Sequence, residues 1–330
     1  MNLNGFSVRP VTVDDAAAIT AMLNLCGMAD VGAQVANEED TRTDLETPDF
    51  NPATDTLGIF TPGGDMAAYG EFWNLTEPRV RPYFFARVHP NYRSQGLGTY
   101  MLEWAAQRSE SVVADAPEGV RVSLRSGTAS QNEGAQQLLQ NAGFSHIRTF
   151  YRMKIEMDAP PPAPQWPDGI TVRTVEYTRD DIHHAYVANE DAFTDHWGHM
   201  PVGFDKWWHW VENDPNFDPT LWFLAMDGDE IAATCFCRPN SNEDPAMGWV
   251  SDLGVRRAWR RRGLGLALLH HCFGEFWRRG QRKVGLGVDA SSLTGATRLY
   301  ERAGMHVYRQ FMTFERELQP GTELSTQTLE

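Results

Sequence analysis

The sequence predicts an α/β fold in which one module of roughly 150 residues occurs twice. The stretch "VHPNYRSQGLGTYMLEWA", from Val88, matches "VRRAWRRRGLGLALLHHC", from Val255. Further along, "GAQQLLQNAGF" from Gly134 matches "GATRLYERAGM" from Gly295. The two matched pairs occur in the same order at nearly the same spacing. An internal repeat of this kind sets the architecture, so we predict two tandem domains.

A proline-rich segment separates the two copies. Residues 158–169 read "DAPPPAPQWPDG", and prolines lack a backbone donor and favour extended geometry. We therefore predict a semi-rigid linker at 158–169, an N-terminal domain at 1–157 and a C-terminal domain at 170–330. The 42% apolar content is ample for two buried cores.

Both copies show the same order of elements. An opening strand precedes a helical region, and Thr12 with Asp15 resembles an N-terminal capping box. Further strands follow, then a helix, a strand, a second helix and a closing strand, with Asp227-Gly228 marking a hairpin turn. The predicted strands are 6–11, 56–60, 66–73, 83–88 and 120–126 in the first copy, and 170–175, 221–226, 230–238, 248–255 and 283–288 in the second.

Two helices complete each copy. The first begins at a glycine loop, and its apolar residues recur at helical spacing in the second copy: Leu268, Leu269, Cys272, Phe273 and Phe276. The second helix carries Ala296, Leu299, Tyr300 and Ala303 on one face. It ends at Gly304, and Gly143 ends its counterpart, because glycine suits a left-handed cap.

Composition narrows the classes of partner. The formal net charge is −15, which argues against nucleic acid and favours encounter with cationic or neutral small molecules. No secretory signal is visible at the N-terminus, and no apolar run approaches the ~20 residues that span a bilayer. We expect a cytoplasmic protein that binds neither nucleic acid nor membrane.

The four cysteines predict no metal site. Cys235 and Cys237 share one face of a predicted strand, where a disulfide between them would be strained. Together with Cys26 and Cys272 they lack the second cysteine or histidine pair of a zinc pattern. We interpret all four as reduced, buried thiols.

The glycine loop of the second copy predicts a phosphate site. Gly263 and Gly265 stand where a strand gives way to a helix, whose free N–H groups attract anions. Arg260, Arg261 and Arg262 add positive charge beside them. The loop lacks the Lys-Ser/Thr of a P-loop and the G-x-G-x-x-G of dinucleotide folds.

Two signatures resemble the GCN5-related N-acetyltransferase (GNAT) family. Residues 260–265 and 93–98 both resemble its Arg/Gln-x-x-Gly-x-Gly/Ala motif, and "ATRLYERAGM" resembles its second motif. The resemblance covers nearly the whole chain as two domains, an architecture similar to that of the mycothiol synthases. It implies a mixed central sheet flanked by helices, whose fourth and fifth strands splay apart around acetyl-CoA.

The resemblance assigns contacts to this co-substrate. In the second copy they are Leu253, Gly254, Val255, Arg260, Arg261, Arg262, Gly263, Leu264, Gly265, Leu266 and Ser292. Ser292 stands where the family often has asparagine, which leaves the start of the following helix open. In the first copy the corresponding candidate second CoA site comprises Ala86, Val88, Arg93, Gln95, Gly96 and Gly98.

The resemblance also implies catalytic roles. Tyr300 would be the acid that protonates the departing thiolate, and the Leu253 N–H would polarise the thioester carbonyl. Asp252 would be either the base or the group that binds the substrate ammonium. The segment containing Glu190, Asp191, Asp195 and His196 is either a wall of the amine pocket or a solvated loop, whereas Trp207, Trp208 and Trp210 read as helix packing.

The first copy lacks the matching groups. Phe85 aligns with Asp252 and Leu139 with Tyr300, although Asn132 and the glycine loop remain. We therefore expect a catalytically silent first domain, either a CoA-binding relic or a structural partner. The chain would be a pseudo-dimer in one polypeptide, monomeric or weakly dimeric.

These observations predict an acetyl-CoA-dependent N-acetyltransferase that acts on a small primary amine by direct attack in a ternary complex. Two alternatives stay open: a non-catalytic acyl-CoA sensor or scaffold, and an enzyme that acetylates peptides or proteins. Intact Asp252 and Tyr300 in one copy argue against a pure binding module.

Overall fold

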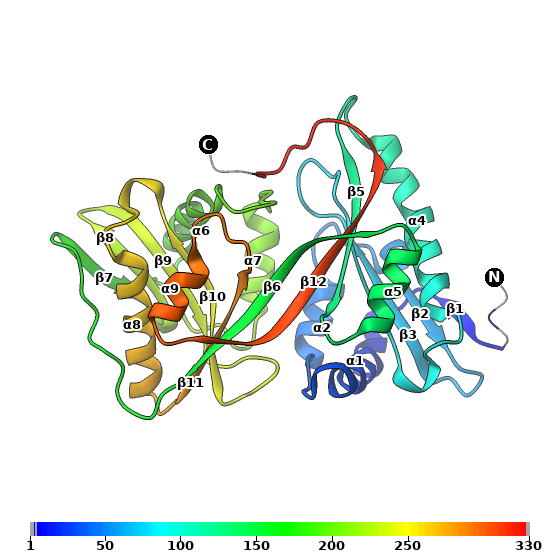
Figure 1. Cartoon of the computed structure of the whole chain (residues 1–330), viewed down its shortest axis with the longest axis horizontal. Coiled ribbons are helices and arrows are strands. Elements are labelled where there is room, and N and C mark those ends of the chain that lie inside the picture. Colours follow the sequence, from blue (N-terminus) through cyan, green and yellow to red (C-terminus); the bar gives the residue numbers. More distant parts are fainter. Residues whose placement is uncertain (1–2, 4, 328–330) are drawn as a thin grey trace. The chain divides into compact units, whose positions relative to one another are not determined.

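The computed structural model describes residue 3 and residues 5–327, which fall into two compact units. The first unit comprises the described residues up to Arg148 together with 205–214 and 311–324. The second comprises 149–204, 215–310 and the described residues from Ser325 onward. Each unit therefore includes chain from both halves of the sequence (Figure 1).

The order of elements is that predicted from the repeat. From the first half come β1 (Ser7–Arg9), α1 (Ala16–Val31), α2 (Glu38–Leu45), α3 (Pro52–Asp55), β2 (Thr56–Phe60), β3 (Met66–Trp73), β4 (Tyr83–Val88), α4 (Leu97–Asp115), β5 (Val122–Ala129), α5 (Glu133–Asn141) and β6 (Ser145–Glu156). From the second come β7 (Ile170–Thr174), α6 (Arg179–Phe193), α7 (Phe204–Glu212), β8 (Trp222–Asp227), β9 (Glu230–Arg238), β10 (Met247–Val255), α8 (Leu264–Arg278), β11 (Lys283–Asp289), α9 (Ala296–Arg302) and β12 (His306–Gln319).

Each unit contains a mixed sheet whose last strand comes from the other half of the chain. In the first unit the order is β1-β2-β3-β4-β5-β12, because residues 311–319 of β12 pair antiparallel with β5. In the second unit the order is β6-β11-β10-β9-β8-β7, because residues 150–156 of β6 pair antiparallel with β11. The closing strands are thus exchanged between the repeats, which the sequence did not predict.

In both units a parallel strand pair separates part-way along. The pairing of β10 with β11 ends at Val250 and Leu286, although both strands continue. The pairing of β4 with β5 ends at Phe84 and Ser126. A bulge between Val250 and Asp252 offsets β10 from β9 at the same level. The splayed sheet of the predicted α/β fold is confirmed.

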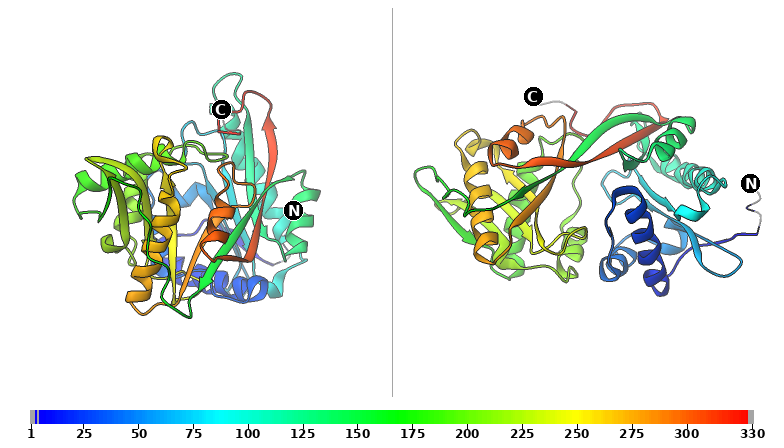
Figure 2. Two further views of the ribbon diagram at one scale, coloured as in Figure 1. Left: turned by 60° about the vertical axis from the view of Figure 1, so that its left-hand side comes forward. Right: turned by 60° about the horizontal axis from the view of Figure 1, so that its bottom comes forward.

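Helices cover both faces of the second unit's sheet (Figures 1 and 2). Side chains alternate along β9, so Thr234 bonds to Asn189 of α6 while Cys235 faces Cys272 of α8. The largest buried cluster lies on the α8 side and includes Leu268, Phe273, Phe276, Val284 and Leu286.

Helix α7 packs on the first unit. Trp210 Nε1 donates to Thr47 Oγ1 over 3.0 Å, and Lys206 forms an ion pair with Asp49 at 2.8 Å. No helix in the described part of the chain is long and apolar enough to cross a membrane.

Candidate functional site

The end of β10 presents peptide groups to the gap between the splayed strands. The Arg256 N–H donates to the Ala232 carbonyl over 3.0 Å, so these two residues form a hydrogen-bonded antiparallel pair. Such pairs alternate along a ladder, and Gly254 and Asp252 therefore also bond toward β9. The N–H groups of Leu253 and Val255 then point the other way, where β11 has diverged. This orientation suits the predicted polarising role of Leu253.

The glycine loop at the start of α8 has the backbone geometry that suits an anion. Gly263 has a φ of 92° and Arg261 a φ of 62°, both left-handed. Alternating backbone hands of this kind aim successive N–H groups into one concavity. The first intrahelical bond runs from Ala267 to Gly263, so the N–H groups of 264–266 precede it and face the loop.

The second loop glycine has a packing role. A Cβ added at Gly265 would lie 3.0 Å from Leu299 Cδ2, and one added at Gly98 would lie 2.6 Å from Leu138 Cδ2. In both units this glycine lets the helix that follows the loop approach the second helix of the motif closely. Its absence of a side chain thus serves helix packing, a reason that the phosphate argument did not supply.

The first arginine of the motif, Arg260, has a structural role: its side chain links the loop to the end of β10, to the end of α6 and to the segment after it. Arg260 bonds through Nε to the Val255 carbonyl over 2.9 Å and through its terminal nitrogens to Asp195 and the Ala192 carbonyl. Arg257 bonds to the same carboxylate at 2.5 Å. The Arg257 hydrogen bond, joined by Arg260, lowers the pKa of Asp195 to about 2. Asp195 thus holds two loop arginines, one of which also bonds to the end of β10.

The other loop arginines differ in how closely they pair with carboxylates. Arg256 pairs with Asp191 at 2.5 Å, whereas Arg262 approaches Asp227 only to 3.7 Å. Arg261 and Arg262 are exposed beside the concavity. Of the three arginines predicted beside the phosphate site, these two are therefore the best placed to meet phosphates.

Asp252 carries the properties of a proton acceptor. Burial raises its pKa to about 6, against the opposing effect of a hydrogen bond from Asn189. Asn189 also accepts from Thr234 Oγ1 over 2.7 Å, which fixes its amide. A carboxylate with such a pKa is ionised at neutral pH yet remains basic enough to take a proton. Sequence reasoning missed Asn189, which no motif marks.

Tyr300 is the candidate acid. It projects from α9, is 7% exposed, and burial raises its pKa above the ordinary tyrosine range. The negative charge of Asp252 contributes to the same rise. The hydroxyl therefore stays protonated at neutral pH and can donate.

One further residue of the predicted pocket, Glu190, lies near Asp252, whereas His196 lies near His199 and Asp195. The charge of Glu190 contributes to the raised pKa of Asp252, and Glu190 approaches His199 at 3.5 Å. Burial and the neighbouring His199 lower the pKa of His196 to about 4, so its imidazole is neutral at pH 7. Glu190 and His196 thus remain candidates for the amine pocket.

The start of α9 differs from that of its counterpart, α5. In the first unit Asn132 caps α5 by accepting from the Ala135 N–H, and α5 begins at Glu133. Ser292 instead accepts from the Ala296 N–H at 3.3 Å, and α9 begins only at Ala296. Aligning Gly295 with Gly134 places Leu293, whose side chain cannot cap a helix, opposite Asn132, and α9 begins two residues later than its counterpart.

The first unit contains a cavity at the corresponding place. Its volume is about 690 Å³, and its walls include five of the six residues of the candidate second CoA site: Ala86, Val88, Arg93, Gly96 and Gly98. Gln95 is not part of the wall and bonds to the Asn91 carbonyl. Arg93 forms a bidentate pair with Asp30, and this pair corresponds to the pairing of Arg260 with Asp195 in the second unit.

The carboxylate on this pair of strands has changed strands between the two units. In the second unit Asp252 on β10 lies directly opposite Phe236 on β9. In the first unit Phe85 on β4 lies directly opposite Glu71 on β3. The acid and the aromatic residue have exchanged positions across the same pair of strands.

Glu71 is pinned where it lies. Its carboxylate accepts from the Tyr69 hydroxyl at 2.6 Å and from Trp73 Nε1 at 2.8 Å. Burial raises the pKa of Glu71. Burial, together with the charge of Glu71, raises the pKa of the neighbouring Asp44 to about 8. Leu139 remains at the position of Tyr300, so the first unit has no hydroxyl acid there.

Comparison with known proteins defines the class. The model of the acetyltransferase (GNAT) family matches residues 32–144 and 179–305, which is more than half of the chain. The chain belongs to this family, and it is an N-acetyltransferase of tandem GNAT architecture. Members of the family use acetyl-CoA as co-substrate.

Individual relatives share this architecture. A mycothiol acetyltransferase of Thermobispora bispora is 28% identical over 304 residues, covering 89% of this chain and 93% of that protein. A crystal structure of a GCN5-related N-acetyltransferase from Sphaerobacter thermophilus is 35% identical, with a TM-score of 0.79 and coverage of 98% and 99%. A tandem GNAT protein from the clavulanic acid biosynthesis pathway shares the fold at 15% identity, with a TM-score of 0.68 and coverage of 96% and 100%.

Proposed function

We propose that the second unit transfers an acetyl group from acetyl-CoA to the primary amine of a small molecule, by direct attack in a ternary complex. The observation that supports this proposal is that Asp252 and Tyr300, the candidate base and the candidate acid, lie in the same unit. Asp252 lies on the strand that diverges from β11, and the pKa of Tyr300 responds to the charge on Asp252.

The proton transfers follow from these two groups. Asp252 takes a proton from the attacking ammonium or amine, so that the nitrogen lone pair forms the bond to the carbonyl carbon. The Leu253 N–H stabilises the developing oxyanion. As the carbon–sulfur bond breaks, Tyr300 donates its hydroxyl proton to the departing thiolate, and the proton taken up by Asp252 returns to Tyr300 through solvent, which restores both groups.

The loop provides the binding energy for the co-substrate. The concavity between Arg261 and the first turn of α8 suits the pyrophosphate, with Arg261 and Arg262 beside it. The peptide groups of Leu253 and Val255 would pair with the pantetheine amides. Arg260 would contribute indirectly, by holding the end of β10 in place.

A small-molecule acceptor is supported by the relatives, several of which are named mycothiol acetyltransferases. Carboxylates near the site, Asp252 and Glu190, suit a cationic amine. The competing classes are a non-catalytic acyl-CoA sensor and an acetyltransferase of peptides or proteins. A sensor would turn over no acceptor.

The test is an acceptor screen followed by initial-rate kinetics. Amino sugars, amino acids, thiol-bearing amines and peptides would be incubated with acetyl-CoA, and acetylated products detected by mass spectrometry, because thiol acceptors react with colorimetric CoA reagents. With the best acceptor, double-reciprocal plots should intersect, as a ternary complex requires. Parallel lines would contradict direct attack, and acetylation of peptides alone would contradict a small-molecule acceptor.

We also propose that the first unit binds an acyl-CoA without turnover, because its cavity of about 690 Å³ lies at the equivalent place. Calorimetry with acetyl-CoA should give two sites per chain for the wild type. The Gly96→Glu variant should give one. A single site in the wild type would contradict this second proposal and leave the first untouched.

A further inference from the structure

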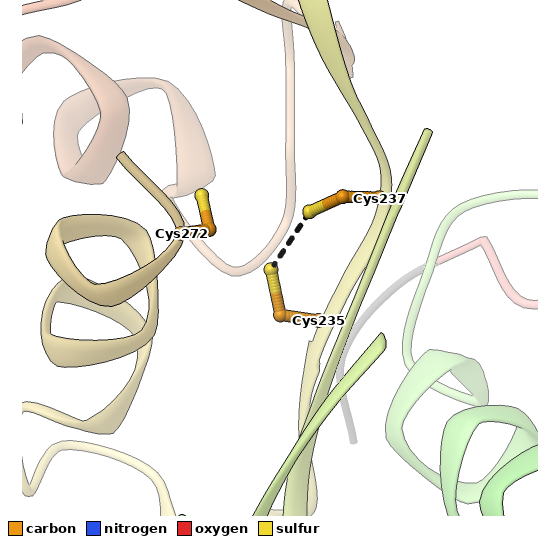
Figure 3. A group of neighbouring side chains, drawn as sticks. All are labelled: Cys235, Cys237 and Cys272. Carbon is orange, nitrogen blue, oxygen red and sulfur yellow. Dashed lines mark hydrogen bonds between the residues drawn. The ribbon is translucent and has the colours of Figure 1, made fainter. Parts of the chain in front are cut away.

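Three cysteines converge in the core of the second unit. Cys235 and Cys237 project from one face of β9, and Cys272 projects toward them from α8 (Figure 3). All three Sγ atoms lie within 4.8 Å of one another, and those of Cys235 and Cys237 are 3.7 Å apart. Each of the three residues is 0% exposed.

The spacing of the three cysteines in the sequence does not predict this cluster. Cys272 is 35 positions beyond Cys237 and on a helix, so no short metal motif joins them. The strand places two thiols on one face at i and i+2, and the helix that covers this face supplies the third. The zinc-pattern argument therefore failed to anticipate a three-sulfur constellation.

The separations match those of a three-coordinate thiolate site. With metal–sulfur bonds of about 2.3 Å, a planar trigonal site sets its sulfurs about 4.0 Å apart. The observed separations require only small movements of side chains to reach this value. Two sulfurs of a disulfide would instead have to approach to about 2.05 Å.

The donor set selects the kind of ion. Among residues 3 and 5–327, no histidine or carboxylate joins the three sulfurs in the cluster. Zinc takes four ligands in structural sites, whereas soft thiolates with a low coordination number suit monovalent copper. We propose that Cys235, Cys237 and Cys272 form a trigonal binding site for a soft monovalent cation of the Cu(I) type.

Binding exchanges protons for metal–sulfur bonds. Burial raises the pKa of the Cys237 and Cys272 thiols, so each bond to the ion forms as one thiol proton leaves. No oxidant or reductant takes part, because Cu(I) enters and remains monovalent.

The ion would lie close to the catalytic strand. Cys235 is directly opposite Leu253 in the β9–β10 ladder. Asp252 precedes Leu253 on β10, and Tyr300 of α9 belongs to the same buried cluster as the three cysteines. Loading the site would therefore change the electrostatic environment of the residues that we propose for acetyl transfer.

Complete burial determines how the ion enters. The thiols become accessible only when α8 opens locally from β9, so uptake by the folded protein should be slow. Uptake should be faster when the ion is present during refolding. The bound ion should also raise the melting temperature, because it binds only the folded cluster.

The experiment uses the reduced full-length chain under anaerobic conditions. Cu(I), supplied as its acetonitrile complex, would be titrated against a chromophoric Cu(I) chelator, and bound copper counted by elemental analysis. We expect one copper per chain and an X-ray absorption spectrum of three sulfurs at about 2.3 Å. Cys272→Ser should weaken binding by at least about 100-fold.

Cys26 provides the matched control. It is the remaining cysteine, lies buried in the first unit and bonds to the Val88 carbonyl. Cys26→Ser should bind copper like the wild type. Cys272→Ala, with circular dichroism and melting curves for both variants, separates loss of a ligand from loss of the fold.

Three results would overturn the assignment. One is a wild type that surrenders all copper to the chelator both in the folded state and after refolding with the ion. Another is equal copper binding by the wild type and by folded Cys272→Ala. The third is treatment with hydrogen peroxide that yields a Cys272 disulfide, two hydrogens lighter by mass, in a chain that takes up no copper.

Discussion

At the scale of single residues, Asp252 is the group whose environment most directly links structure to chemistry. Its carboxyl would be ordinary on a surface, but burial raises its pKa to about 6. The resemblance predicted this position, and the bulge before Asp252 with the Asn189 hydrogen bond shows how the fold creates its environment. Neither the bulge nor Asn189 could be deduced from local sequence, because both depend on pairing across the sheet.

The raised pKa of Asp252 predicts the pH dependence of catalysis. A base must be ionised, so kcat/KM should rise with pH through a midpoint near 6 and then level off. The pKa of Tyr300 lies above the usual tyrosine range, so no decline should follow near neutrality. Asp252→Asn should lower kcat about 100-fold or more and remove the midpoint. A variant that keeps the same midpoint would assign it to another group.

Asp44 predicts a pH dependence of stability. Its folded pKa of about 8 is raised above the unfolded value near 3.8, so the folded state retains a proton that the unfolded state releases. The free energy of unfolding should therefore fall as pH rises between these values. Asp44→Asn cannot ionise and should raise the melting temperature at pH 8.

The control for this prediction lies on the same helix. Glu39 is exposed on α2, and Glu39→Gln should leave the pH dependence of melting unchanged. Equal pH dependence of melting in Asp44→Asn and the wild type would show that Asp44 does not carry the effect.

At the scale of elements, the sequence predicted where the glycine loop lies, but it predicted only part of the reason for its glycines and arginines. The helix begins at the loop as expected, yet Gly265 is required by the approach of Leu299, and Arg260 is engaged with Asp195. Sequence marks a glycine or an arginine without showing its neighbour. Tertiary contacts decide whether the residue meets a ligand or another side chain.

Gly263 tests the loop as a phosphate site. Its Cβ would meet nothing within 4 Å, but its φ of 92° strains any other residue by about 1–2 kcal/mol. Gly263→Glu adds negative charge to that strain and should weaken acetyl-CoA binding at least tenfold by calorimetry, roughly 1.4 kcal/mol or more.

A second glycine, Gly280, provides a control that distinguishes the effect of the added charge at the loop from the effect of backbone strain. Gly280 has a φ of 87° in open space beyond α8, and Gly280→Glu should destabilise the chain similarly while leaving acetyl-CoA affinity unchanged. Equal affinities for both variants would remove the loop from the co-substrate site.

At the scale of the whole molecule, the repeat predicted the order of elements but not the exchange of closing strands. The two copies are alike, so a closing strand could pair with β5 or β11 by pattern alone. One signal was available: β6 has 12 residues and β12 has 14, well above the usual five or six. A strand of this length can leave one unit and enter the other.

The exchange predicts which fragments are stable. A chain of residues 170–330 lacks β6 and leaves β11 as an exposed edge, which should cause aggregation. A chain of residues 145–330 retains β6 and should melt at a higher temperature. Residues 157–330 keep the linker without β6 and should behave like 170–330. Similar melting of all three fragments would show that β6 contributes little to the second unit.

The most direct test of the central claim, that the second unit carries out acetyl transfer with Tyr300 as its acid, is the kcat of Tyr300→Phe with an acceptor from the screen. Removing only the hydroxyl should lower kcat by about 10²–10⁴-fold and leave the Kd for acetyl-CoA within about twofold. Tyr308, whose hydroxyl bonds to Glu243 in the same unit, supplies the matched Tyr308→Phe control, which should keep wild-type kcat. A Tyr300→Phe enzyme with wild-type kcat would contradict the account.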